Sequence, residues 1–327
     1  MRVLLIDADS TIPNLALMKL STHYKSIGWD VDLLKLNIQY YPNRKNQIKE
    51  IETIDYDQIL CSVIFPRTLQ YIKGDNIEYG GTGYSLEKTL PTEIECLEPD
   101  YSIYPENTIS YGFITRGCIR NCYFCYVPKK EGSIRKVNEI ENIVRHKKVK
   151  FMDNNILAYQ GHKKELSKIV ELGVRCQFNQ GLDIRLLDKE NSVLLSKLNY
   201  IGEYIFAFDD WKYRNIIDKK LELMLWRKDW QLKFFIYVNP EMPIADTINR
   251  IKYLHDKKCL PYIMRDLTCW DSPNKDFYTD IASWCNQPQF FKKMTFGEFL
   301  NRRTKNKNRI ERSLKLYNQL NITSVAK

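Results

Sequence analysis

Residues 116–127 have the sequence RGCIRNCYFCYV, which places Cys118, Cys122 and Cys125 on one short segment with the spacing C-x3-C-x2-C. Thiolates this close along a chain can converge on one metal centre. A structural zinc site needs a fourth protein ligand, yet no other cysteine or histidine lies within twenty residues on either side of the three. Three thiolates without a fourth ligand favour an iron–sulfur cube that leaves one iron open to a non-protein ligand.

The cysteine segment, with Phe124 directly before its third cysteine, resembles the cluster-binding motif of the radical S-adenosylmethionine (SAM) superfamily. The resemblance implies that Cys118, Cys122 and Cys125 are the metal ligands of a 4Fe-4S cluster and that the open iron binds SAM. It also implies an enzyme, in which the reduced cluster cleaves SAM to methionine and a 5′-deoxyadenosyl radical that abstracts hydrogen from a substrate. Such an enzyme takes its electron from an external donor, a flavodoxin- or ferredoxin-like protein.

Composition and charge restrict the class of protein. Apolar residues make up 44% of the 327 residues, which is ordinary for a globular protein and excludes wholesale disorder. The apolar run at the N-terminus is too short for a signal peptide, and no apolar stretch approaches the roughly 18 residues that a membrane span needs. Nine cysteines without a secretion signal indicate reduced thiols. We therefore expect a cytoplasmic protein without a membrane partner.

Residues 1–85 are expected to form a small α/β unit with parallel strands. Between the first two strands, a helix is predicted to be capped by Ser10 or Thr11 and to end at Gly28. The strands are predicted from short apolar runs at residues 3–6, 31–36 and 59–65.

This N-terminal unit resembles the Rossmann-like cobalamin-binding domain that precedes the barrel in one branch of the radical SAM superfamily. In that branch, a histidine in the loop after the first strand ligates cobalt. Residues 7–11 occupy that loop here, and their sequence DADST contains no histidine. We therefore expect no cobalamin, and a domain that has lost this cofactor or contacts the substrate instead.

From residue 109 onward, apolar runs alternate with helical spacing and predict an α/β fold with six strand–helix units. Such alternation gives a parallel sheet, and six units match the open, partial (βα)6 barrel that the resemblance implies. We expect the barrel at residues 109–270, a proline-containing linker at 86–108 before it, and a basic, mainly helical extension at 271–327 after it. The strands of the barrel are predicted at residues 109–115, 149–152, 174–178, 204–208, 232–238 and 260–264.

Polar residues follow the ends of the predicted strands, where the functional residues of such barrels collect. The resemblance implies that residues 153–155 hold the amino group of SAM and that Phe124 packs beside its adenine. Arg185 can form a bidentate pair with the methionine carboxylate, while Gln180 or Asp183 can meet the ribose hydroxyls. The residues predicted to bind SAM are Phe124, Asp153, Asn154, Asn155, Asn179, Gln180, Asp183, Arg185 and Asp209.

The strand–helix pattern stops after Asp266, and we predict an irregular segment there. Cys259, Cys269 and Cys285 lie in or beside it, with spacings that match no cluster motif. Buried thiols are favoured for these three, with an auxiliary cluster as the alternative. A final helix is predicted from apolar residues at helical spacing, namely Ile310, Leu314, Tyr317 and Leu320.

The net charge of +10 leaves open an anionic partner. Arg120, Lys129, Lys130 and Arg135 lie beside the cysteines in the sequence, where they would raise the local concentration of an anionic substrate. We expect nucleic acid or a nucleotide as the substrate, ahead of a peptide or small metabolite. A second class of function, a non-catalytic iron–sulfur protein that senses redox state or binds nucleic acid, needs the cysteines but not the polar strand ends. The sequence leaves the oligomeric state and the reaction subtype open.

Overall fold

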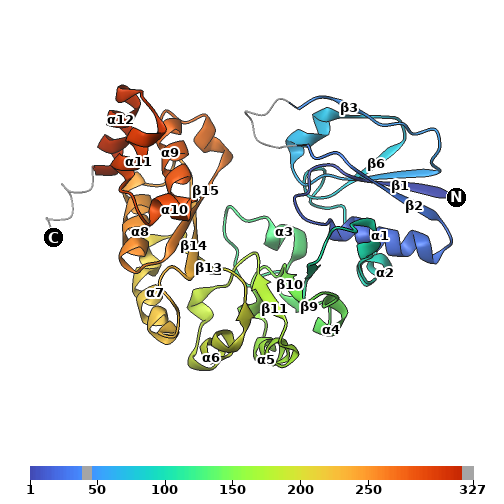
Figure 1. Ribbon diagram of the computed structural model, residues 1–327, viewed down its shortest axis with the longest axis horizontal. Coiled ribbons are helices and arrows are strands. Elements are labelled where there is room, and N and C mark those ends of the chain that lie inside the picture. The colour runs from blue at the N-terminus through green and yellow to red at the C-terminus, as the bar shows by residue number, and fades with distance from the viewer. Residues whose placement is uncertain (39–45, 319–327) are drawn as a thin grey trace. The chain divides into compact units, whose positions relative to one another are not determined.

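The computed structural model of the chain describes residues 1–38 and 46–318 (Figure 1). The chain divides into two compact units, Met1–Asn154 and Asn155–Lys327. Both units are mixed α/β structures with parallel strand pairs, so the predicted α/β class is confirmed. None of the helices among these residues has the length and apolar character that crossing a bilayer requires.

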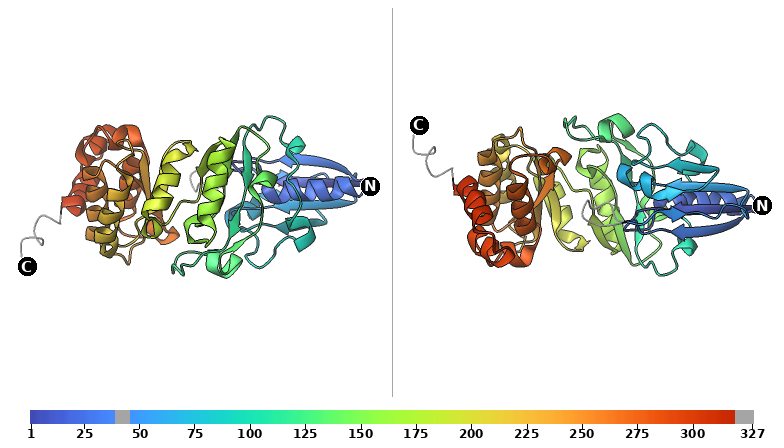
Figure 2. Two further views of the ribbon diagram at one scale, coloured as in Figure 1. Left: turned by 90° about the horizontal axis from the view of Figure 1, so that it is seen from below. Right: turned by 90° about the horizontal axis from the view of Figure 1, so that it is seen from above.

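A four-stranded parallel sheet forms the N-terminal part of the first unit. Helix α1 (Leu15–Ser26) lies along one face of it (Figure 2), where Leu17 and Tyr24 pack on Val3 and Leu5. A second apolar cluster packs on the opposite face of the sheet, so both faces are covered. In spatial order, the strands of this sheet are β2 (Asp30–Lys35), β1 (Arg2–Asp7), β4 (Gln58–Ser62) and β6 (Ile77–Gly80). The chain between them adds β3 (Lys49–Glu50), the short helix η1 (Pro66–Tyr71) and β5 (Ile72–Lys73).

The three strands and the helix predicted for this part are confirmed, but the prediction of the residue that caps the helix was wrong. Asn14, not Ser10 or Thr11, caps α1, because Asn14 Oδ1 accepts hydrogen bonds from the amides of Ala16 and Leu17 at 3.1 and 3.3 Å. The side-chain amide of Asn14 also donates to the hydroxyl of Ser10 at 3.1 Å. Ser10 therefore supports the capping residue from the loop before the helix.

Residues 86–108, predicted to be a linker, are bonded along α1. They contain the helical turns α2 (Thr92–Glu95) and η2 (Tyr101–Ile103). Asp100 pairs with Lys25 of α1 at 2.7 Å. This segment therefore packs against α1. Together, α1 and the four-stranded sheet β2-β1-β4-β6 are called the N-terminal sheet domain below.

The rest of the first unit carries the cysteine segment between short strands. A parallel pair is formed by β7 (Ser110–Gly112) and β10 (Lys148–Phe151), which confirms the strands predicted at 109–115 and 149–152. An antiparallel pair is formed by the two-residue strands β8 (Thr115–Arg116) and β9 (Arg135–Lys136). The helices here are single turns, α3 (Val127–Glu131) and α4 (Ile140–Ile143).

The second unit contains two groups of parallel strands. Helices α8 and α9 pack against the larger group, which has three strands (Figure 1). The four strands predicted in this part of the chain are confirmed. The strands are β11 (Arg175–Phe178) paired with β12 (Asn199–Tyr200), and β13 (Tyr204–Ala207), β14 (Leu232–Val238) and β15 (Leu260–Arg265) in that order. The helices are α5 (His162–Leu172), α6 (Lys189–Lys197), α7 (Arg214–Leu221), α8 (Ile244–Asp256), α9 (Lys275–Cys285), α10 (Pro288–Phe291), α11 (Phe296–Arg303) and α12 (Lys307–Asn318). Single turns are η3 (Ile156–Ala158), η4 (Ile184–Leu186), η5 (Trp211–Tyr213), η6 (Glu222–Met224) and η7 (Leu267–Trp270).

The region after Asp266 is largely helical, in line with the helical extension expected at 271–327, so the irregular segment predicted to follow Asp266 was wrong. Phe277, Ile281 and Cys285 recur every four residues and form the buried face of α9. Cys259, Cys269 and Cys285 are all buried, as predicted, and burial raises the pKa of Cys259 and of Cys269 to about 11.

The final helix, α12, confirms the predicted helical spacing of Ile310, Leu314 and Tyr317. Leu320 lies outside the described residues.

Asp280 joins three helices of the second unit. Its side chain has no exposed surface, and it accepts hydrogen bonds from Arg303 of α11 at 3.0 Å and from Arg309 of α12 at 2.6 and 2.9 Å. Asp276, one turn earlier on α9, has a side chain that is 40% exposed and pairs with Arg309 at 3.4 Å. Of the two carboxylates, Asp280 is the buried one.

We expect Asp280→Ala to lower the free energy of unfolding by about 2–4 kcal/mol, because it leaves two arginines without their buried counter-charge. Asp276→Ala, on the same helix, should lower it by less than about 1 kcal/mol, since exposed pairs contribute little. Chemical denaturation of the two variants measures both values. Equal losses would contradict the role given to Asp280.

Candidate functional site

The cysteine loop, residues 117–132, is closed at its base. Strands β8 and β9 pair directly outside it, and the amide of Cys118 donates to the carbonyl of Gly132 at 3.2 Å. Gly117 has a φ of 83°, and a Cβ at this position would lie 2.3 Å from the carbonyl oxygen of Ser133. Only glycine therefore fits directly before the first cysteine.

Cys118, Cys122 and Cys125 are partly exposed thiols on this loop. The amide of Arg120 donates to the sulfur of Cys118 at 3.3 Å, and the amide of Cys125 donates to the carbonyl of Cys122 at 2.9 Å. Cysteines ligate metals in their thiolate form.

The donor set of the loop can be compared with the predicted cluster. Across the described part of the chain, no group of three or more His, Cys, Asp or Glu side chains is arranged to hold a single metal ion. The thiolates of an iron–sulfur cube bind separate irons, so they lie farther apart than the ligands of one ion. By number, chemistry and exposure, the three thiols fit a cube with one open iron, and the placement of their sulfurs around it stays a prediction.

Glu131, at the end of α3, holds the base of the cysteine loop. Its Oε1 accepts a hydrogen bond from Arg116 at 2.9 Å, and its Oε2 accepts one from the amide of Gly117 at 3.0 Å. The side chain is only 11% exposed. Sequence reasoning missed Glu131, because its only signal was a lone acidic residue in a basic stretch.

Asp153 and Asn154 follow β10, and their side chains bond to the flanks of the cysteine loop. The Asp153 carboxylate has no exposed surface and accepts hydrogen bonds from the amide and hydroxyl of Thr115, both at 2.6 Å. Burial raises the pKa of Asp153 to about 6. Asn154 donates to Glu131 at 2.7 Å. Both residues were predicted to bind SAM, and in this arrangement they support the strand and the helix on either side of the loop.

In the second unit, three of the predicted SAM-binding residues lie close together. Arg185 donates to both carboxylate oxygens of Asp183, at 2.7 and 2.9 Å, and its guanidinium lies 4.6 Å from the centre of the Tyr213 ring. Burial raises the pKa of Asp209, while nearby Arg250 and Arg185 lower it. Arg185, predicted to pair with the carboxylate of SAM, is therefore already paired with a carboxylate of the chain.

The other residues predicted to bind SAM differ in how far their side chains are exposed. Asn179 is partly exposed and Gln180 is exposed after β11, whereas Asn155 is buried. Phe124 is partly exposed and makes an edge contact with the Tyr123 ring, with ring centres 5.3 Å apart.

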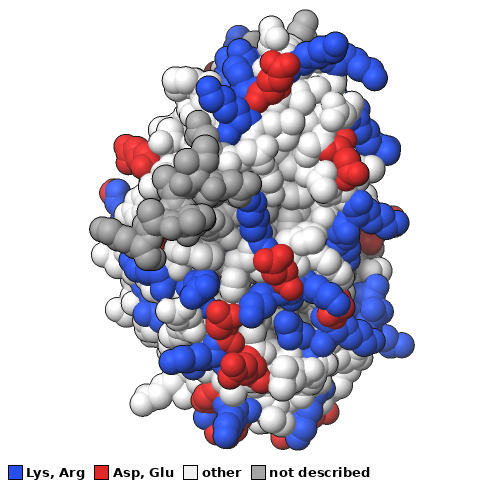
Figure 3. All heavy atoms as spheres, turned by 90° about the vertical axis from the view of Figure 1, so that its left-hand side faces the viewer, with Lys and Arg blue, Asp and Glu red and all other residues white. Residues whose placement is uncertain are grey.

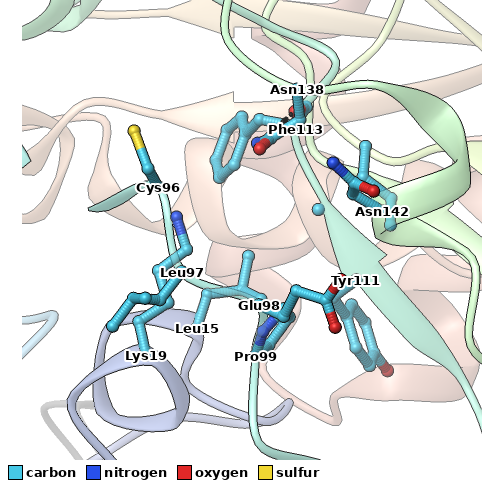
Figure 4. Close-up of a pocket in the computed structure, with 12 residues that line it drawn as sticks. Leu15, Lys19, Cys96, Leu97, Glu98, Pro99, Tyr111, Phe113, Asn138 and Asn142 are labelled. Carbon is cyan, nitrogen blue, oxygen red and sulfur yellow. Dashed lines mark hydrogen bonds between the residues drawn. The ribbon is translucent and has the colours of Figure 1, made fainter. Parts of the chain in front are cut away.

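A cavity in the first unit is too small for a cofactor. It has a volume of about 20 Å³ and lies between α1, the segment after α2 and β7 (Figure 4). Lys19, Cys96, Tyr111 and Phe113 are among its lining residues. This volume has room for about one water molecule, so the cavity is not a binding site for a molecule the size of SAM.

Comparison of the chain with protein-family models and with curated proteins found no match.

The stability of the protein should depend on the titration of Asp153. Because its folded pKa of about 6 lies above the ordinary value of about 3.9, the folded state binds this proton more tightly than the unfolded state. The contribution of Asp153 to the free energy of unfolding is therefore greatest below about pH 4 and falls by about 2–3 kcal/mol as the pH rises to about 6. The measurement is denaturation of the wild type and of Asp153→Asn, which cannot titrate, across this range. A difference between the two that stays constant with pH would contradict the assignment.

Proposed function

We propose that the chain is a radical SAM enzyme, in which Cys118, Cys122 and Cys125 hold a 4Fe-4S cluster. The observation that carries the proposal is the cysteine loop itself. It presents three partly exposed thiols within eight residues, and its base is held by a glycine and by the carboxylate of Glu131, which is 11% exposed. The loop contains no histidine and no further cysteine, which suits a cluster with an open iron better than a structural zinc site.

The order of the strands supports a partial (βα)6 barrel as the finer fold. The strands β7, β10, β11, β13, β14 and β15 follow one another along the chain, with helices between them. In the first unit β7 pairs with β10, and in the second unit β14 pairs with β13 and β15. All of these pairs are parallel. The cysteine loop follows β7 and β8, so it lies beyond the carboxyl end of a strand, where barrels place their functional residues.

When bound, a 4Fe-4S cluster with an open iron supplies the electron that cleaves SAM between its sulfur and C5′, and an external donor protein must provide that electron. The residues of the chain would bind and orient SAM. Arg185 is held in a fixed orientation by Asp183, and its planar guanidinium suits the carboxylate of methionine. Asp209 lies close enough to Arg185 and Asp183 for both charges to shift its pKa.

Anaerobic reconstitution should load about four irons and four sulfides per chain. Replacing any one of Cys118, Cys122 and Cys125 with alanine should abolish the broad absorbance of the cluster. Cys96→Ala is the matched control, because Cys96 is also an exposed thiol of the first unit. Zinc in place of iron, or equal loss of iron in the control, would contradict the proposal.

We also propose an anionic substrate, with nucleic acid favoured. Residues 116–136 contain six Lys and Arg but a single acidic residue, Glu131, which is bonded inside the unit. Tyr123 and Tyr126 are 74% and 53% exposed on the same loop, and exposed aromatic rings among basic residues suit stacked bases beside phosphates. Figure 3 shows that Lys and Arg also outnumber Asp and Glu on the side of the molecule where α8, α10, α11 and α12 lie.

Oligonucleotides should bind the full chain with an affinity that falls steeply as salt rises, with a log–log slope of several units. Lys129→Ala and Arg135→Ala should each lower that slope by about one. Lys88→Ala, an exposed lysine paired with Glu78, is the control and should leave the slope unchanged. No binding at about 50 mM salt would instead favour a peptide or small metabolite.

A further inference from the structure

We infer that a chain of ion pairs from α1 to the cysteine loop positions that loop, and that the N-terminal sheet domain acts through it as a scaffold. Four residues make up this chain: Lys19, Glu95, Arg116 and Glu131. All four lie in the first unit, and none of them is a predicted cluster ligand. The inference rests on the proposed function only for the identity of the cofactor that the loop holds.

The chain begins at a lysine that is almost removed from water. Lys19, on α1, is 7% exposed, and a buried ammonium is retained only when it is paired and hydrogen-bonded. Its Nζ lies 3.0 Å from Oε1 of Glu95 and also donates to the backbone carbonyl of Glu95. Glu95 at the end of α2 is thus fixed to the N-terminal sheet domain.

The same carboxylate oxygen of Glu95 reaches the strand before the cysteines. Arg116, in β8, donates from Nη2 to Oε1 of Glu95 at 3.0 Å and from Nη1 to Oε1 of Glu131 at 2.9 Å. Its guanidinium lies 3.6 Å from the centre of the Phe113 ring, which fixes the plane of the group. Because the guanidinium is rigid and planar, the positions of the two carboxylates are linked through it.

The chain ends on the backbone of the cysteine loop. Oε2 of Glu131 accepts hydrogen bonds from the amide of Gly117 and from the side chain of Asn154, at 3.0 and 2.7 Å. Gly117 directly precedes Cys118 and has the left-handed backbone already described. The contacts of Glu131 therefore determine the direction in which the chain leaves β8 toward the first cysteine.

The charges alternate along the four residues, so each interior member has an opposite charge on both sides. Removing Glu131 leaves the amide of Gly117 without its acceptor and Arg116 with one partner fewer. Removing the charge of Lys19 leaves Glu95 paired with Arg116 alone, so the effect on the loop is indirect and smaller. Glu131 is also a negative charge bonded next to Cys118, so its loss should make a bound cluster easier to reduce.

Hydrogen exchange of the cluster-free, full-length chain tests the positioning directly. We expect Glu131→Gln to speed amide exchange in residues 117–126 by about tenfold or more, the scale for a lost hydrogen bond to a charged group. Lys19→Met should speed exchange in the same residues by a smaller factor. Glu139→Gln is the matched control, since Glu139 is an exposed carboxylate of the same region that pairs with Lys136 at 2.7 Å; its exchange should match that of the wild type.

Three results would overturn the inference. Unchanged exchange in Glu131→Gln would remove the positioning role, and unchanged exchange in Lys19→Met would remove the scaffold role of the N-terminal domain. Faster exchange throughout β13–β15 of the second unit as well would show global destabilisation instead of a local effect.

A second readout uses the reconstituted protein at equal iron content. The reduction potential of the cluster in Glu131→Gln should be higher than in the wild type and in Glu139→Gln, with an altered electron paramagnetic resonance spectrum. An unchanged potential and spectrum would contradict a positioning role at the cluster. If the wild type holds no iron, the proposed function fails, while the exchange experiment still decides whether the ion pairs position the loop.

Discussion

The negative charge of Glu131 has to be balanced inside the first unit, and the way it is balanced fixes the base of the cysteine loop. Arg116 pairs with one oxygen of this carboxylate, and the amide of Gly117 donates to the other. The side chain is only 11% exposed, so groups of the chain take the place of most of its water. The loop that carries Cys118, Cys122 and Cys125 therefore has a defined start, although the segment between its ends contains little regular structure.

At the end of β1 and in the loop after it, the carboxylates of Asp7 and Asp9 are hydrogen-bonded within the protein. Asp7 accepts hydrogen bonds from the hydroxyl of Tyr104 at 2.9 Å and from the amide of Ser10 at 3.1 Å, and burial raises the pKa of Asp7. Asp9 accepts one from the hydroxyl of Thr68 at 2.6 Å. The cobalamin-binding branch carries its histidine in the corresponding loop. That cobalamin does not bind stays a prediction, and these contacts give it a physical reason: the polar groups of the loop already bond to the chain.

The sequence predicted the elements that depend on local pattern and missed those that depend on distant partners. The apolar run at 232–238 coincides with β14, and Gly173 ends α5 with a φ of 61°, because strand burial and helix termination are written in neighbouring residues. Asn14 was missed as the cap of α1, since the choice among several polar residues depends on the course of the loop before the helix. Glu131 was missed because its partners lie 14 to 23 residues away in the chain. The pair between Arg185 and Asp183, only two residues apart, could have been anticipated, yet both were assigned to SAM from the strand-end pattern alone.

The proposed function requires that the cysteine loop support reductive cleavage of SAM. The most direct test is to incubate the anaerobically reconstituted full chain with dithionite and SAM and to measure 5′-deoxyadenosine by chromatography. We expect 5′-deoxyadenosine and methionine in equal amounts from the wild type and from Cys96→Ala, and neither product from Cys122→Ala. Intact SAM after incubation with a wild-type chain that carries about four irons would contradict the claim and would favour a non-catalytic iron–sulfur protein.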